Sequence, residues 1–176
     1  MEYSNQIIED LFQKFKPILG EDCNRYKNHV YRVFLNCLLM DSNENNIEKY
    51  AIAGVFHDIG IWTAHTIDYL YPSIEQAKLY LTESGKQEWI EEITLMIYWH
   101  HRTSQYQGKH KTTVEYFRKA DWMDVSLGLI NFGFDRQKIK AFRKKLPNLG
   151  FHLFLLNRIF KNFFKHPFNP LPMFKN

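Results

Sequence analysis

The stretch of the chain that decides its fold is Tyr50-Ala51-Ile52-Ala53-Gly54-Val55-Phe56-His57-Asp58-Ile59-Gly60. Its apolar run is typical of a buried helix, yet it ends in two adjacent polar residues, His57 and Asp58. Because neighbouring residues differ by about 100° around a helix, these side chains can reach one site only where the helix ends, as Gly60 indicates. A buried imidazole and a buried carboxylate also require partners. We therefore expect polar residues from other helices to meet this pair.

Candidate partners are embedded in other apolar, helical stretches of the sequence. They are His29, His100, His101 and Asp121. Several such residues on different helices can satisfy one another through a shared metal ion. Imidazole suits transition metals and carboxylate oxygen suits harder divalent ions, so a mixed site favours Mn, Fe, Co, Ni or Mg, with Zn as an alternative. Two His and two Asp on a six-coordinate ion would leave positions for water and substrate.

The order of these motifs along the chain is distinctive. It is His29, then His57-Asp58-Ile59-Gly60, then Ile97-x-x-His100-His101, then Ala120-Asp121. Over roughly residues 25–128 this set resembles the HD-domain superfamily of metal-dependent phosphohydrolases, in the form of a small stand-alone HD protein. The resemblance implies an all-α helical bundle with a central metal-binding cleft, and phosphate-ester hydrolysis as the activity. It also implies the metal ligands, which would be His29, His57, Asp58 and Asp121.

The resemblance leaves two roles for the paired histidines. In two-metal HD proteins a His at the Ile-x-x-His position, here His100, helps to bind a second ion. Alternatively, His100 or His101 contacts the substrate phosphate without binding metal. We predict one ion per chain rather than two. In the expected catalytic scheme Asp58 also positions or deprotonates water, while Arg32 and either His100 or Arg102 stabilise the phosphoryl charge.

Charged residues near the motifs are further candidates for substrate binding. Arg32 follows His29 by three residues, on the same helix face, and can pair with a phosphate or a carboxylate. Arg102, Lys109 and Lys111 are expected to border the mouth of the cleft, where they could neutralise phosphate or remain ordinary surface charges.

Arg118 and Asp124 lie three residues before and three residues after Asp121, on the same helix face. Arg118 would be a hydrogen-bonding partner of Asp121, whereas Asp124 would orient a ligand or bind substrate. The segment 61–72 after the His-Asp motif is expected to form a loop beside the site that selects the substrate. His65 and Asp68 are its polar candidates.

Helical periodicity runs through almost the whole chain. Apolar residues at helical spacing from Ile7 to Phe15 are followed by Pro17 and Gly20, which are expected to end the run. Pairs typical of a capping box indicate helix starts at Asp41, Ser73, Ser84 and Thr112. After the first run, the expected helices cover about residues 22–40, a segment that begins after Asp41 and ends near Gly60, and then residues 74–84, 85–101, 113–127, 135–145 and 149–165.

No segment alternates as a strand would, so the expected fold class is all-α with seven or eight helices. We expect a single HD domain over residues 1–176. Its motif core would cover about 25–128, and residues 129–176 would supply C-terminal helices that pack on the core.

The net charge of +4 conceals a division between two halves of the chain. Residues 1–100 hold 8 Lys and Arg against 15 Asp and Glu, whereas residues 101–176 hold 15 against 4. The excess of Lys and Arg in residues 101–176 indicates either an anionic partner or packing against the acidic half. A small phosphorylated substrate bound between the halves would account for part of this excess. Binding of nucleic acid or a membrane surface by the Phe-rich basic helix near 149–165 is the alternative.

Several classes of protein are set aside by the same sequence. No stretch of 18 apolar residues could form a transmembrane segment, and the start of the chain lacks a signal-peptide pattern. Cys23 and Cys37 form no framework spacing, which favours a cytoplasmic protein with reduced cysteines. The oligomeric state is not determined by the sequence.

Two other classes of function use the same motifs. One is an HD-fold hydratase or di-iron oxygenase that acts on a small non-phosphate substrate. The other is a nucleotide-binding regulatory module without catalysis.

Overall fold

The computed structural model describes residues 4–165, which form helices joined by turns. The α-helices are α1 (Gln6–Leu19), α2 (Cys23–Met40), α3 (Ile47–Phe56), α4 (Gly60–Thr63), α5 (Leu70–Glu83), α6 (Ile90–Trp99), α7 (Lys111–Val125), α8 (Arg136–Lys145) and α9 (Phe151–Lys165). Short 3₁₀ helices at Gly20–Asp22, Glu44–Asn46 and Gln87–Trp89 precede α2, α3 and α6. No strand occurs within the described part of the chain, which confirms the all-α prediction.

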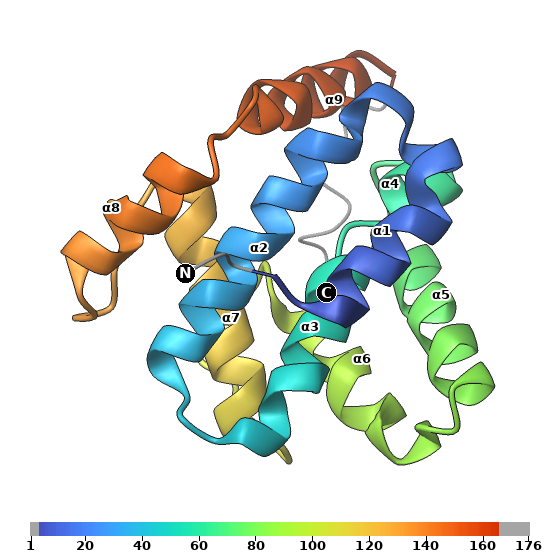
Figure 1. Cartoon of the computed structure of the whole chain (residues 1–176). Helices are drawn as coiled ribbons and strands as arrows, with labels where there is room; N and C mark the ends of the chain where they lie inside the picture. The colour runs from blue at the N-terminus through green and yellow to red at the C-terminus, as the bar shows by residue number, and fades with distance from the viewer. Residues whose placement is uncertain (1–3, 166–176) are drawn as a thin grey trace.

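The central helix of the fold is α2, which packs against α1, α3, α7, α8 and α9. Helix α6 packs against α3, α5 and α7. Helices α2 and α7 lie side by side, and α9 crosses over the N-terminal end of α2 (Figure 1). The acidic half of the chain supplies α1 to α6 and most of the buried apolar residues, and the basic half supplies α7 to α9.

Helix α2 carries a polar stripe on its buried face. His29, Arg32 and Asn36 are spaced by three and four residues, so they lie on one side of the helix. All three are buried, and Asn36 donates a hydrogen bond of 3.2 Å to the carbonyl oxygen of Ala120 on α7. This stripe places the first expected metal ligand against α7, the helix that carries Asp121.

The apolar stretch quoted above forms α3, which ends at Phe56 and not near Gly60 as expected. The chain turns through residues 57–59 and then begins α4. A Cβ atom on Gly60 would lie 2.4 Å from the carbonyl oxygen of Tyr69 and 3.0 Å from the backbone nitrogen of Ser73. Glycine is therefore required because the start of α5 approaches this turn closely, and the turn holds His57 and Asp58 in the interior.

The helix starts follow the sequence signals only in part. Asp135 caps α8 as predicted, because its side chain accepts hydrogen bonds from two N–H groups of the first turn. The four capping-box predictions are wrong. Asp41 accepts from Asn43 N–H and from the hydroxyl of Tyr50, Ser73 lies inside α5, and α6 and α7 begin without a side-chain cap.

Helix α1 continues through Pro17 to Leu19, although Pro17 was expected to end it. Leu19 is buried one turn after Phe15, and its burial offsets the hydrogen bond that proline removes. Gly20, with φ +53, ends the helix as predicted.

Helix α9 has a buried beginning and an exposed end. The ring of Phe151 is buried 4.3 Å from that of His29, whereas Phe160, Phe163 and Phe164 are exposed. The expected packing of this helix on the core holds for its first half. Phe168, also part of the Phe-rich segment, lies outside the described residues. No helix of residues 4–165 is long and apolar enough to cross a membrane.

Candidate metal centre

Four elements converge on one cluster of histidines and aspartates. Helix α2 contributes His29, the turn after α3 contributes His57 and Asp58, the end of α6 contributes His100 and His101, and α7 contributes Asp121. His101 is partly buried and the others are buried. The fold thus brings together the residues that were expected to bind a metal, from segments far apart in the sequence.

The four expected ligands face one another at short range. Nε2 of His29 lies 3.0 Å from Nε2 of His57 and 3.6 Å from Oδ1 of Asp121. Nε2 of His57 lies 3.4 Å from Oδ2 of Asp58 and 3.8 Å from Oδ1 of Asp121. Ligand atoms about 2.1 Å from a metal are about 3.0 Å apart in neighbouring octahedral positions. His29, His57 and Asp58 therefore form a group of donor atoms that could hold one ion, whereas Asp121 lies beside both histidines but outside that group.

The hydrogen bonds of the imidazoles leave their inward nitrogens as acceptors. Nδ1 of His29 lies 2.7 Å from Oδ2 of Asp124, and Nδ1 of His57 lies 2.7 Å from the carbonyl oxygen of Gly54. Because these oxygens only accept, each Nδ1 carries the proton and each Nε2 presents a lone pair. In the neutral rings, two lone pairs that face each other at 3.0 Å cannot form a hydrogen bond, and the arrangement suits a cation bound by both nitrogens.

A second group of donor atoms adjoins the first. Asp58, His100 and His101 could also hold a metal ion. Oδ1 of Asp58 and Nε2 of His100 are buried 3.6 Å apart, and neither has a hydrogen-bond partner. Unpartnered buried atoms are rare in folded proteins, and both of these atoms could act as ligands of an ion. Asp58 therefore directs one carboxylate oxygen to each group.

The electrostatics of the cluster suit a metal ion. Burial lowers the pKa of His57 to about 3, so its ring is neutral, as a metal ligand must be. Burial raises the pKa of Asp121 to about 6. Burial also opposes ionisation of Asp58, but His57 and His100 outweigh it and hold the pKa of Asp58 below its usual range. Carboxylates with so little water gain most from a nearby cation.

A buried ion pair fixes the orientation of His29. Arg32 donates from Nε to Oδ1 of Asp124 at 2.6 Å and from Nη2 to Oδ2 at 2.8 Å, and Nη1 donates to the carbonyl oxygen of Leu146 at 2.9 Å. Burial opposes ionisation of Asp124, yet His29 and Arg32 lower its pKa. Asp124 thus orients His29, an expected ligand, which is one of the two roles predicted for it. Arg32 pairs with a carboxylate and does not line the pocket beside the cluster.

The other expected cations lie elsewhere. Arg102, Lys109 and Lys111 do not line the pocket beside the cluster. Lys109 pairs with an acidic residue of α6, and the Arg102 guanidinium lies over two aromatic rings of the same helix. Arg118 donates to both carboxylate oxygens of Glu115, at 2.8 and 2.9 Å, instead of pairing with Asp121. These side chains satisfy local partners that the sequence spacing did not reveal.

The pocket beside the cluster is small and mostly apolar. Its volume is about 120 Å³, and it is lined by Ile67, Tyr69, His101, Asp121, Trp122, Val125, Leu155 and Ile159; we call it the inner pocket. The loop between α4 and α5 contributes to it, as predicted for segment 61–72. Its polar candidates His65 and Asp68, however, are exposed and do not line this pocket.

Two tyrosines near the cluster were not predicted. The hydroxyl of Tyr26 accepts from the backbone N–H of Asp58 at 3.3 Å and donates to the carbonyl of Val55 at 2.7 Å, so it holds the turn after α3. The hydroxyl of Tyr69 shares a hydrogen bond with Nε2 of His101. Tyr26 precedes His29 by three residues, a spacing that could have marked it. Tyr69 carries no comparable signal.

No family model, no curated protein and no solved structure matches this chain. The function must therefore be inferred from the cluster and its surroundings.

Proposed function

We propose that this chain is a metal-dependent hydrolase of small phosphate esters, of the HD type that its motifs resemble. The observation that supports this most directly is the pair of Nε2 lone pairs of His29 and His57, 3.0 Å apart, beside the carboxylates of Asp58 and Asp121. A mixed set of imidazole and carboxylate donors is typical of sites for Mn, Fe, Co, Ni or Mg, and it also accepts Zn.

The roles of the residues follow from their positions. When bound by His29, His57, Asp58 and Asp121, a divalent ion supplies positive charge for a phosphoryl oxygen and lowers the pKa of a bound water. In this proposal Asp58 orients that water and accepts its proton. His100 presents an unpartnered Nε2 beside Asp58, where it can donate to a phosphoryl oxygen once protonated. The apolar walls of the inner pocket exclude bulk water.

The test combines metal analysis with a substrate panel. Protein purified without chelators should contain one divalent ion per chain and should cleave some phosphate monoester or nucleotide with added Mn, Co, Ni or Mg. Asp58→Asn should lower turnover by about 10²-fold or more. The matched control is Asp68→Asn, which changes an exposed aspartate of the neighbouring loop and should leave turnover unchanged. Failure to cleave any ester, or full activity of Asp58→Asn, would contradict the proposal.

One observation favours a second candidate. Asp58, His100 and His101 could hold a second ion, and a di-iron oxygenase needs two. Two tightly bound iron ions together with oxygen consumption would favour that function over hydrolysis, whereas hydration of a small nitrile would favour the hydratase. If the protein binds nucleotides without any turnover, it is instead a regulatory module.

A further inference from the structure

The inner pocket differs from the usual surroundings of a bound phosphate. Apart from His101 and Asp121, its lining contains no charged side chain, and Ile67, Val125, Leu155 and Ile159 supply much of its wall. An apolar cavity of about 150 Å³ is known to accept a benzene molecule, so the inner pocket, at about 120 Å³, is comparable to one small ring or a short alkyl group. The part of a ligand that lies beside the cluster is therefore expected to be apolar.

A pocket with basic side chains adjoins the inner pocket. A neighbouring pocket of about 340 Å³, which we call the outer pocket, shares Ile67 with it and is lined by His65, Ile67, Arg158, Lys161, Asn162 and Phe164. Both pockets also use α9. Leu155 and Ile159 face the inner pocket, and Arg158 and Lys161 face the outer one. The loop and the helix thus place an apolar compartment and a basic compartment next to each other.

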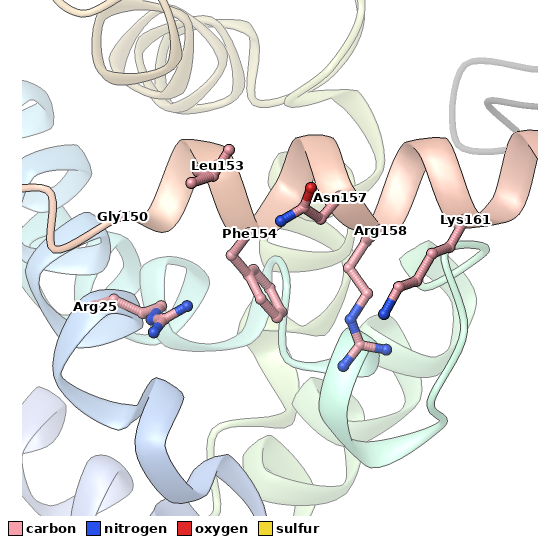
Figure 2. Close-up of a pocket in the computed structure, with 7 residues that line it drawn as sticks. All are labelled: Arg25, Gly150, Leu153, Phe154, Asn157, Arg158 and Lys161. Carbon is pink, nitrogen blue, oxygen red and sulfur yellow. The ribbon is translucent and has the colours of Figure 1, made fainter.

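The side chains of Arg158 and Lys161 also line a further pocket. Figure 2 shows Arg158 and Lys161 extending from the same side of α9, into a third pocket of about 510 Å³ beside Arg25. Arg25 already pairs with Asp22 at 3.3 Å. Within residues 4–165, by contrast, no Asp or Glu forms an ion pair with Arg158 or Lys161. The Arg158 guanidinium lies 5.2 Å from the ring centroid of Phe154, which restricts its position.

We infer that the substrate is an amphipathic molecule with an anionic group at its far end. Its apolar, ring-sized part occupies the inner pocket, and Arg158 and Lys161 bind the remote anion in the outer pocket. The inference rests on the proposed function, because it assigns the phosphoester to the cluster and these two pockets to the leaving group. Paired cations without a carboxylate partner offer charge-assisted hydrogen bonds to a carboxylate or phosphate.

The experiment compares two esters that differ only in the remote anion, phenyl phosphate and para-carboxyphenyl phosphate. In the double variant Arg158→Gln/Lys161→Gln, KM for para-carboxyphenyl phosphate should rise about ten-fold, the loss of one charge-assisted contact. KM for phenyl phosphate and kcat for both esters should change little. The matched control is Lys138→Gln/Lys144→Gln, which removes two exposed charges of α8 and should leave all constants unchanged. Arg158→Lys should restore most of the preference.

Two substitutions in α9 test the role of the inner pocket. Leu155→Gln should raise KM for both esters, because Leu155 lines the inner pocket. Leu153→Gln, at an exposed position two residues earlier, should not. Equal melting temperatures of the variants establish that any change in KM is not due to loss of the fold.

Binding without turnover separates this inference from the proposed function. Calorimetry with para-carboxybenzylphosphonate, which has no cleavable ester, measures the pockets even if no ester is hydrolysed. Weaker binding by Arg158→Gln/Lys161→Gln without hydrolysis by the wild type would support the pockets and refute the hydrolase. The reverse result, hydrolysis with the same KM for both esters in the wild type and the double variant, would overturn the inference. The inference would also be wrong if Arg158→Gln/Lys161→Gln weakened the binding of an oligonucleotide but not the binding of the phosphonate.

Discussion

At the scale of single residues, the orientation of the cluster depends on side chains that lie outside it. Asp124 accepts from the guanidinium of Arg32 on two oxygens and from Nδ1 of His29 on one of them. Arg143 of α8 adds a contact of 2.8 Å. The charge of Asp124 is therefore what keeps the proton of His29 on Nδ1 and its lone pair directed to the cluster.

Replacement of Asp124 should affect both metal binding and stability. Asp124→Asn keeps the shape but leaves the buried guanidinium of Arg32 without its counter-charge, so we expect a loss of about 3 kcal/mol in the free energy of unfolding. Metal affinity should fall by about 10- to 100-fold. Urea unfolding of the metal-free protein and metal titration measure the two effects separately. Unchanged affinity in a folded variant would show that Asp124 does not orient His29.

A second buried pair predicts a dependence of stability on pH. Burial opposes ionisation of Glu115, but the guanidinium of Arg118 and the N–H of Tyr106 lower its pKa below the ordinary value. The unfolded chain therefore binds a proton at Glu115 at higher pH than the folded protein. Its contribution to stability is complete above the unfolded pKa of about 4.3 and is lost as pH falls through the folded pKa.

Glu115→Gln isolates this contribution. The difference in melting temperature between wild type and Glu115→Gln should be largest near neutral pH and should shrink as pH falls below about 4.3. Thermal unfolding from pH 3 to pH 7 measures it. A difference that does not vary with pH would mean that the ion pair with Arg118 does not form.

At the scale of elements, the turn between α3 and α4 decides where the cluster can form. The turn presents His57 and Asp58 together, and it fits because Gly60 allows the start of α5 to approach. The N–H of Gly60 donates to Oγ of Ser73 at 2.9 Å, so the two elements are joined by a hydrogen bond at the point of contact.

Gly60→Ala tests this close approach. Its new Cβ would lie 2.4 Å from a backbone oxygen, so we expect a loss of about 3 kcal/mol, at the upper end for an overpacked site. The comparison is Gly133→Ala, which has open space but φ +83 and should lose about 1 kcal/mol. Chemical denaturation measures both. A loss from Gly60→Ala no greater than that from Gly133→Ala would indicate that α5 can shift freely.

At the scale of the whole molecule, the buried cluster lowers the stability of the metal-free protein. Asp121 is buried with its pKa raised to about 6 by burial, and Oδ1 of Asp58 accepts no hydrogen bond within the described residues. Such groups lower the stability of a fold until a ligand satisfies them. Metal binding is then expected to stabilise the folded chain by mass action.

Metal should raise the melting temperature only when the cluster is complete. An ion at 100 times its dissociation constant adds about 2.7 kcal/mol to the free energy of unfolding, and a chelator should reverse the gain. Asp121→Asn should lose most of that gain, although its metal-free form should be at least as stable as the wild type, because a buried charge has been removed. Differential scanning calorimetry with and without metal provides the measurement. Equal gains in both proteins would place the ion elsewhere.

The sequence predicted which residues gather in the cluster better than it predicted their surroundings. His and Asp residues within apolar helices could be recognised because a buried polar side chain requires a partner wherever the helix packs. The cations were less predictable. Arg32 pairs with the carboxylate of Asp124 and not with a substrate-facing group. Arg118 was expected to bind Asp121 but binds Glu115, because a linear sequence does not reveal which carboxylate lies closest.

The sequence by itself determined the helical class, the residues that gather in the interior, and the cap of α8 by Asp135. These follow from periodicity and from the chemistry of single side chains. Only the tertiary structure decided that α3 ends at Phe56, that Tyr69 reaches His101, and that α9 forms the wall of the inner pocket. Such features depend on contacts between segments that are distant in the chain, and no local pattern specifies which surfaces will meet or how closely.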